Sequence, residues 1–469
     1  MKRIGIGAAL AIAGVATSAS ANGNFDWGYL LQLQTQQTSL PLFGVLEPVK
    51  DSSTASIDAA TANANPNALV TVAKGLKVRT VSARADLGPN IDQMVPWPNA
   101  TAPTHLIACN EEGAAQPGLQ RIRLSDGAVE TILTGTISCD PVRATPWGTV
   151  LFGEENGTSG WMIELANPLA TTGVVFDRVA GTVSGGVGAE NVVTRPALGR
   201  LSFEGLALYE SGVVYYGDEN RPGTGTAGGA YFKFVPTHPW TGGPPITDLS
   251  LSPLADGQVY GLRLGKRSGN TDYGQGSNTG LGTWIPVTPS FNANLRAAAA
   301  SLKLTGYYRP EDIDIDRVAE AAGNVRFCGN NTGNEGDDEN FGETVCITDG
   351  SLSEALSNTA TPELQYFVIG YPDFAMMDNI AQQPHRGNWL IQEDGDGPAV
   401  GRNNDIFSCL DDRADSNLLS DGCVRVLTLN DLNAETTGGI FDAAGLRYWV
   451  SIQHNVTGHG VVLEITGWR

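Results

Sequence analysis

The amino-acid sequence predicts an all-β fold, namely a six-bladed β-propeller with loop insertions. Short apolar runs alternate with clusters of turn-forming residues, and the 58 glycines and 25 prolines among 469 residues favour turns over helices. An apolar run followed at once by carboxylates or amides recurs six times, ending near residues 110, 154, 218, 329, 393 and 453. Most intervals between these ends are roughly 45 to 65 residues, which is typical of propeller blades. A pair of β-sandwich domains is the alternative, because strands at regular spacing also suit that fold.

The chain divides into three predicted segments. Residues 1–21 have a basic start, an apolar stretch and small residues before a cleavage point, as in a secretory signal peptide. Residues 22–73 are polar and form a predicted N-terminal entry segment, and residues 74–469 form a single propeller domain. Within that domain, helices are expected only at 294–304, 313–322 and 352–357.

The composition limits where the protein acts and what it binds. A signal peptide predicts a periplasmic or extracellular protein, and no later stretch approaches the ~20 continuous apolar residues of a membrane helix. The net charge of −21 argues against nucleic acid as a partner, because like charges repel. An acidic chain is suited to binding cations, and we expect it to act as a monomer.

Carboxylates at the strand ends are candidate ligands for hard metal ions such as Ca²⁺. Glu154 and Glu155 follow one apolar run, and Asp218 follows another. Adjacent side chains on a strand point to opposite sides, so only part of each group can reach a shared site. The alternative for each group is a solvated charged turn. Glu204 differs because it is embedded in an apolar strand, where a buried carboxylate needs a cation or a strong hydrogen-bond partner.

Two further segments carry candidate site residues. Arg309 precedes Glu311 by two residues, so the two side chains share one side of an extended segment. A guanidinium can bind an oxyanion with paired donors while the carboxylate holds a metal beside it. An ordinary ion pair is the alternative. Glu393 begins a segment that resembles part of a calcium-binding loop, without the full twelve-residue loop or its closing glutamate.

The six cysteines of an exported protein are expected to form disulfides. Cys328 with Cys346, and Cys409 with Cys423, each enclose a short polar loop, and we predict both pairs. Two readings of Cys139 stay open. It forms a third disulfide with Cys109, or it is a thiolate metal ligand.

Several of these motifs, in this order, resemble the PhoX-type alkaline phosphatase family. The resemblance runs from about Lys74 to the C terminus and is carried by Cys139, Thr145–Thr149 with Glu154–Asn156, Phe203–Gly205, Arg309–Asp312 and Glu393–Gly395. It implies a six-bladed propeller whose channel mouth holds Ca²⁺ together with a pair of Fe³⁺ ions and hydrolyses phosphate monoesters outside the cytoplasm.

The resemblance also implies roles for individual residues. Arg309 would contact the phosphate, and Arg309 and Glu311 would be catalytic. Cys139 would be an iron ligand. The other implied metal ligands are Glu155 or Glu154, Glu204, Asp218, Glu311 and Glu393.

Two other classes of function are consistent with the same residues. One is a different calcium-dependent propeller hydrolase, such as a phosphodiesterase, phytase or lactonase. The other is a non-catalytic, calcium-stabilised surface protein. The sequence has no Gly-x-Ser-x-Gly elbow and no His-Glu-x-x-His motif, so catalysis would depend on carboxylate-bound metals. Arg309 and Cys139 discriminate among these possibilities, since oxyanion chemistry requires the former and the iron-containing version the latter.

Overall fold

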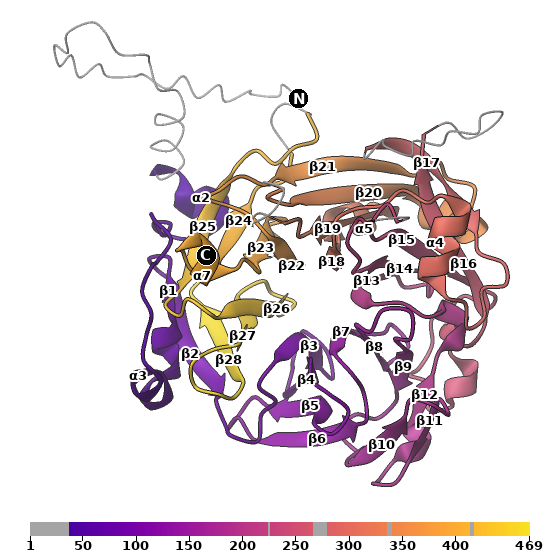
Figure 1. Ribbon diagram of the computed structural model, residues 1–469, viewed down its shortest axis with the longest axis horizontal. Helices are drawn as coiled ribbons and strands as arrows, with labels where there is room; N and C mark the ends of the chain where they lie inside the picture. Colours follow the sequence, from indigo (N-terminus) through magenta and orange to yellow (C-terminus); the bar gives the residue numbers. More distant parts are fainter. Residues whose placement is uncertain (1–36, 224–225, 266–278, 335–339, 413–416) are drawn as a thin grey trace, which may run out of the picture. The chain divides into compact units, whose positions relative to one another are not determined.

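Six innermost strands surround a common axis in the computed structural model, and each begins a run of strands that extends outward (Figure 1). Neighbouring strands are antiparallel except for one parallel pair in the first of these runs. The structure describes residues 37–223, 226–265, 279–334, 340–412 and 417–469. The predicted signal peptide, residues 1–21, lies outside the described residues. The innermost strands are β3 (Ile91–Trp97), β7 (Cys139–Ala144), β13 (Phe203–Leu208), β18 (Pro310–Ile315), β22 (Met377–Gln382) and β26 (Glu435–Phe441). Each contacts the next, and β26 contacts β3, which closes the ring.

Two sheets are built from the first part of the ring. The first contains β3, β4 (His105–Asn110), β5 (Pro117–Arg123), β6 (Val129–Thr134), β10 (Val174–Asp177) and β11 (Thr182–Ser184). The second contains β7, β8 (Val150–Glu154), β9 (Met162–Leu165) and β12 (Val192–Thr194).

A nine-stranded sheet contains two of the six innermost strands, one at each end. Its order is β13, β14 (Val214–Asp218), β15 (Tyr231–Pro236), β16 (Gly257–Leu264), β17 (Gly280–Pro286), β21 (Glu363–Ile369), β20 (Glu343–Ser351), β19 (Asn324–Asn331) and β18. The two halves join where Gly280 and Leu281 of β17 pair with Leu364 and Glu363 of β21.

The first two strands of the described chain complete the last two sheets. One contains β22, β23 (Trp389–Glu393), β24 (Asp405–Cys409), β25 (Cys423–Leu429) and the early strand β1 (Val70–Val72). The other contains β26, β27 (Arg447–Gln453), β28 (Val461–Thr466) and β2 (Lys77–Ser82). An N-terminal strand on the outer edge of each C-terminal sheet ties the beginning of the domain to its end.

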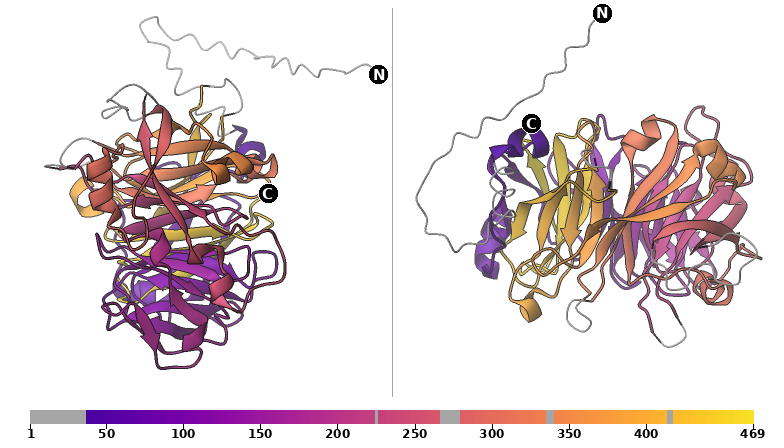
Figure 2. Two further views of the ribbon diagram at one scale, coloured as in Figure 1. Left: turned by 90° about the vertical axis from the view of Figure 1, so that its right-hand side faces the viewer. Right: turned by 90° about the horizontal axis from the view of Figure 1, so that it is seen from above.

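The propeller class is therefore confirmed, but the expectation of six separate blades is wrong, because the described strands form five hydrogen-bonded sheets. The difference has a local cause. The outer strands β17 and β21 pair with each other, so two radiating arms of strands become one continuous sheet. The sheets stand side by side around the axis in the right panel of Figure 2.

The helices of the described residues are short and lie before β1 or in connections between strands. Two expected helices are present, α4 (Leu295–Leu302) and α6 (Leu352–Ser357). The third, α5, covers only Arg317–Ala321, because residues 313–315 belong to β18 and the Asp316 carboxylate caps the helix by accepting from the backbone N–H groups of Val318 and Ala319. The remaining α-helices in the described part of the chain are α2 (Ser39–Phe43), α3 (Ala59–Ala64) and α7 (Gly397–Val400), and its 3₁₀ turns are η1 (Pro66–Leu69), η2 (Ala189–Asn191), η3 (Pro196–Leu198), η4 (Leu249–Leu251) and η5 (Pro253–Ala255).

The apolar core lies between neighbouring sheets. Ile107 and Leu119 of the first sheet pack in one cluster with Val142 and Phe152 of the second. Every residue of β8 is buried, as expected for a strand covered on both faces. Among the described residues, none of the helices combines the length and apolar character needed to cross a membrane.

Candidate metal centre

A polar cavity of about 210 Å³ lies at one end of the ring of innermost strands. Ten carboxylates line it together with Arg309 and His454. They are Asp92, Glu111, Asp140, Glu155, Glu204, Glu219, Glu311, Asp378, Asp394 and Glu435. Four sequence-predicted site residues, Glu155, Glu204, Arg309 and Glu311, are thus brought together.

A β-bulge recurs at the same place in five innermost strands. In β13, for example, Phe203 pairs with Asp218 and Leu206 pairs with Tyr216. The chain therefore advances three residues along β13 but only two along β14, which leaves one extra residue in β13. The same offset occurs in β3, β7, β18 and β22. A bulge bends its strand and re-aims a side chain. The first bulged residue in each strand is a cavity carboxylate, and these are Asp92, Asp140, Glu204, Glu311 and Asp378.

The strand that pairs with each innermost strand supplies the other half of the site, from the residue that directly follows that strand. At five of the six positions this residue lines the cavity, namely Glu111, Glu155, Glu219, Asp394 and His454. At the sixth, the Thr332 hydroxyl donates to Glu311 Oε1 at 2.6 Å. Two recurring positions, the first bulged residue of an innermost strand and the residue after its neighbouring strand, therefore account for nearly all the cavity lining.

Glu154 is not a cavity residue, so its predicted role as a metal ligand is wrong. It is the last residue of β8, and its side chain points away from that of Glu155, as strand alternation requires. Arg178 Nε donates to Glu154 Oε1 at 2.6 Å, and the backbone N–H groups of Ile137 and Trp161 also donate to this carboxylate. An arginine thus already neutralises the carboxylate and completes its hydrogen bonds.

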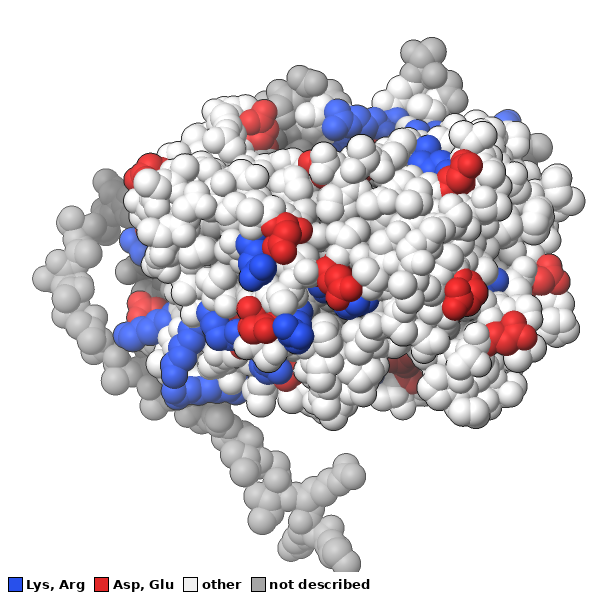
Figure 3. All heavy atoms as spheres, turned by 90° about the horizontal axis from the view of Figure 1, so that it is seen from below, with Lys and Arg blue, Asp and Glu red and all other residues white. Residues whose placement is uncertain are grey.

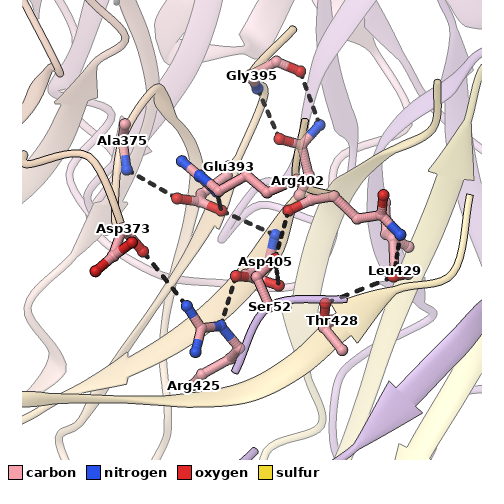
Figure 4. Close-up of polar contacts among 12 residues, drawn as sticks. Ser52, Asp373, Ala375, Glu393, Gly395, Arg402, Asp405, Arg425, Thr428 and Leu429 are labelled. Carbon is pink, nitrogen blue, oxygen red and sulfur yellow. Dashed lines mark hydrogen bonds and ion pairs between the residues drawn. The ribbon is translucent and has the colours of Figure 1, made fainter. Parts of the chain in front are cut away.

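The structure also contradicts the predicted metal-ligand roles of Asp218 and Glu393. Each is the last residue of its strand and pairs with an arginine outside the cavity. Arg296 Nη2 donates to Asp218 Oδ1 at 2.6 Å. Arg402 Nη1 donates to Glu393 Oε2 at 2.8 Å, and backbone N–H groups of Ala375 and Asp405 donate to the same carboxylate (Figure 4). The neighbouring carboxylates Glu219 and Asp394 reach the cavity instead.

Cys139 forms a disulfide with Cys109, so its predicted role as a thiolate ligand is also wrong. Both sulfurs are buried, and the bond joins β7 to β4 of the preceding sheet. The two predicted disulfides, Cys328–Cys346 and Cys409–Cys423, are present as well. Among the described residues that line the cavity, none carries sulfur.

We expect thiol titration of the unreduced, denatured protein to detect no free thiol, because all six cysteines are paired. Reduction before titration should release six. About two thiols per chain without reduction would mean that Cys109 and Cys139 are free. Cys139 would then again be a candidate thiolate ligand of a metal ion.

The crowded carboxylates perturb one another's titration. Burial, and after it the charges of neighbouring carboxylates, raise the pKa values of Asp140, Glu204 and Asp378 well above the usual range. Burial raises the pKa of Glu311 to about 8, against the opposing effect of Arg309. Without cations, ionising this site is costly, so bound divalent ions would stabilise it.

Three groups of carboxylates are close enough to hold metal ions, with one oxygen from each member lying within 4.8 Å of the others. The groups are Asp140–Glu155–Glu204, Glu204–Glu311–Asp378 and Asp378–Asp394–Glu435. Glu204 and Asp378 each belong to two groups, so the three candidate sites form a chain along the cavity.

The donor set fits Ca²⁺, which prefers six to eight oxygen ligands. A buried oxygen of Asp92, Oδ1, has no hydrogen-bond partner within the protein, as expected for an atom that faces a cation. Thiolate-ligated Fe³⁺ does not fit, because the cysteine that would supply the sulfur is in a disulfide.

Arg309 is the only guanidinium among the described residues that line the cavity, and three carboxylates hold it. Its Nε donates to Glu219 Oε1 at 2.7 Å and lies 3.2 Å from Glu311 Oε1, while Nη2 lies 3.5 Å from Asp394 Oδ2. Although burial opposes the charged form, Glu311 and Asp394 raise the pKa of Arg309. The backbone of Arg309 is left-handed, with φ of 57°, a costly conformation that is common where a functional side chain must be aimed.

Acidic and basic side chains are interspersed on the outer face shown in Figure 3. By contrast, ten of the 50 acidic residues meet in this one cavity. The acidic composition therefore serves the cavity and not only the solubility of the surface.

Comparisons with known proteins agree with the propeller fold. Residues 101–455 match the family model described as alkaline phosphatase PhoX. No curated protein matches the chain. The structure of Pseudomonas fluorescens PhoX in complex with vanadate, a transition-state analogue, is similar, with a TM-score of 0.61 and 17% identity over 89% of this chain and 98% of that one.

Two other similar structures are more distant. One is the PQQ-bound aldose sugar dehydrogenase of Streptomyces coelicolor, with a TM-score of 0.41 and 12% identity over 85% of this chain and 98% of that one. The other is a gluconolactonase of Xanthomonas campestris, with a TM-score of 0.41 and 13% identity over 89% of this chain and 99% of that one.

Proposed function

Because the chain belongs to the PhoX family of alkaline phosphatases, we propose that it is a secreted, calcium-dependent phosphatase that hydrolyses phosphate monoesters at the carboxylate cavity. The observation that carries this proposal is the placement of Arg309, which is the single guanidinium among ten carboxylates in the described lining of the cavity. Carboxylates alone would repel a phosphate dianion. A set of carboxylates that binds Ca²⁺ around one arginine would attract it.

The three carboxylate groups would hold Ca²⁺ ions, each group contributing oxygens from three different strands or strand ends. Bound Ca²⁺ would offset the negative charge of a phosphoryl group and of the cavity itself. Fe³⁺ is not part of the proposal, because its thiolate ligand is unavailable.

The residues of the chain would orient the ester. Arg309 would donate paired hydrogen bonds to two phosphate oxygens, a geometry suited to a planar guanidinium. Glu219 and Asp394 hold that guanidinium at the cavity, which limits the entropy lost when the ester binds. Thr332 fixes the orientation of Glu311, whose carboxylate lies beside Arg309 in the site.

The size of the cavity bears on the substrate. At about 210 Å³ it is smaller than the ~300–1,000 Å³ typical of pockets that enclose a whole drug-sized ligand. A phosphoryl group can enter, while a bulky leaving group would remain at the mouth. We therefore propose that the enzyme accepts phosphate monoesters with varied leaving groups.

The three disulfides support the proposal of export, because such bonds persist in oxidising compartments such as the periplasm.

We expect the purified protein to hydrolyse p-nitrophenyl phosphate in Ca²⁺ and to lose nearly all activity in a calcium chelator, because the empty cavity repels phosphate. Restoring Ca²⁺ should restore activity, and vanadate should inhibit it. Bis(p-nitrophenyl) phosphate and a lactone serve as parallel substrates. Faster hydrolysis of the diester or the lactone would identify a different hydrolase, and Ca²⁺ binding with no turnover of any of the three would leave a non-catalytic calcium protein.

A further inference from the structure

Arg143 of β7 lies behind the carboxylate cavity and joins three innermost strands. Its Nη1 donates to Gln93 Oε1 of β3 at 2.5 Å, and its Nη2 donates to Asp312 Oδ1 of β18 at 2.7 Å. The same Nη2 donates to the carbonyl of Ile313 at 3.0 Å. The Arg143 side chain is only 15% exposed, and it is not among the residues that line the carboxylate cavity.

Both side-chain partners of Arg143 lie in the recurring bulges. Gln93 directly follows Asp92, and Asp312 directly follows Glu311. Asp312 also accepts from the backbone N–H of Ile380 at 3.3 Å, in the strand that carries Asp378. Through Gln93 and Asp312, Arg143 thus supports the strands that carry Asp92, Glu311 and Asp378.

Gln93 extends the contact to a fourth carboxylate. Its Nε2 donates to Asp140 Oδ1 at 3.3 Å. An arginine has only donors, so its bond to Gln93 requires the amide oxygen to face Arg143 and leaves the amide nitrogen to face Asp140. Without Arg143, the amide could rotate and present its oxygen to a carboxylate.

Arg143 lies outside the lining of the carboxylate cavity, so it would not contact an ester bound there. It also lines a separate cavity of about 810 Å³, which is formed by the other ends of β3, β22 and β26 together with α5. The Arg143 layer, including Gln93 and Asp312, therefore forms the floor of the metal site on the side away from its mouth.

We propose that Arg143 is a positioning residue of the metal site, orienting Asp140 through Gln93 and holding the bulge of Glu311 through Asp312. This inference rests on the proposed function only in that calcium is the bound ion. Partners that orient metal ligands commonly change metal affinity by about 10- to 100-fold when they are removed.

The test is calorimetric titration of the chelator-treated, full-length protein with Ca²⁺, which requires no turnover. We expect Arg143→Met and Gln93→Leu each to weaken Ca²⁺ binding by about 10-fold or more. Arg143→Lys should recover part of the affinity, since lysine can reach one acceptor but not two. Activity of these variants should return toward the wild-type value as Ca²⁺ is raised, with little change in KM for the ester.

Arg195→Met is the matched control, because Arg195 is buried and pairs with Glu164 at 2.5 Å outside the cavity. It should lower the Tm without changing the Ca²⁺ affinity. Gln93→Leu keeps the Arg143–Asp312 pair. If Arg143→Met does not fold, the Ca²⁺ affinity of Gln93→Leu therefore tests the positioning role. Ca²⁺ affinity within twofold of the wild type in the folded variants would overturn the positioning role. A wild-type protein that binds no Ca²⁺ would overturn the inference and the calcium-dependent function together, whereas Ca²⁺ binding without phosphatase activity would overturn only the function.

Discussion

Replacing Arg309 with alanine is expected to lower kcat/KM for p-nitrophenyl phosphate by about 10²- to 10³-fold, the usual effect of removing one preorganised donor to a developing oxyanion. The effect should be large because Arg309 is the only guanidinium among the described residues of the cavity wall. Three carboxylates hold it in place, so it contributes charge at a fixed position and reorganises little when the ester binds. Steady-state kinetics at saturating Ca²⁺ measure the loss directly.

Two further variants make the result specific. Arg309→Lys keeps the charge but loses the paired donors, so it should recover only part of the activity. Arg121→Ala removes a buried arginine from the first sheet, where Arg121 bonds to the carbonyls of Pro168 and Thr171 far from the cavity lining. That control should keep its activity per folded molecule. An Arg309→Ala enzyme with wild-type kcat/KM would show that the phosphoryl group binds elsewhere.

The recurring strands identified the fold class because their signal is local. Apolar runs and turn residues lie within a few positions of each other, and both were read correctly as β-structure. The number of separate sheets depended on a contact that no local pattern contains. Gly280 and Leu364 are distant in the sequence, and their pairing merges two arms of strands into one sheet.

The site was predicted in part because the sequence marks where a strand ends but not which carboxylate faces the axis. Glu155 lines the cavity as the strand end suggests, whereas Glu154 does not, because its arginine partner Arg178 comes from a different connection. Glu204 was identifiable because a lone carboxylate in an apolar strand requires a partner. Arg309 and Glu311 were identifiable from their spacing together with the family resemblance.

Three of the eight other described residues that line the cavity were missed because a bulge is a property of backbone pairing. Asp92, Asp140 and Asp378 reach the cavity only because each innermost strand has one extra residue at that point. A usable signal was nevertheless present. Aligning the six repeats on one another would have placed Asp140 and Asp378 at the position of Glu204, and Glu219 and Asp394 at the position of Glu155.

The second large effect is expected at Glu204, which is shared by two of the three candidate ion sites. Glu204→Gln removes one charge from each site, so it should lower activity at moderate Ca²⁺ by about 10²-fold and greatly reduce the rise in Tm that Ca²⁺ produces. In chelator at alkaline pH, where Glu204 is ionised, the same substitution should raise the Tm by roughly 2 °C, because it removes a buried charge that repels Asp140 and Glu311. Thermal unfolding with and without Ca²⁺ measures both effects.

The direction in which folding stability changes with pH follows from the Glu204 carboxylate. Burial and neighbouring carboxylates raise the pKa of Glu204 well above its unfolded value, so between these two values the folded state binds more protons than the unfolded state. The stability of the chelated wild type should therefore fall as pH rises above the ordinary carboxylate range. Glu204→Gln carries no titrating group at this position, so its stability should fall less over the same range.

Glu154→Gln provides the matched control, because Glu154 is equally buried but pairs with Arg178 outside the cavity. Weakening that pair should lower the Tm with and without Ca²⁺ and leave the calcium-induced rise unchanged. The two glutamates thus predict opposite signs in chelator, although both are buried and the family resemblance implies a metal ligand at either. If Glu204→Gln instead lowered the Tm equally in chelator and in Ca²⁺, Glu204 would be a structural carboxylate like Glu154, and the ions would have to bind without it.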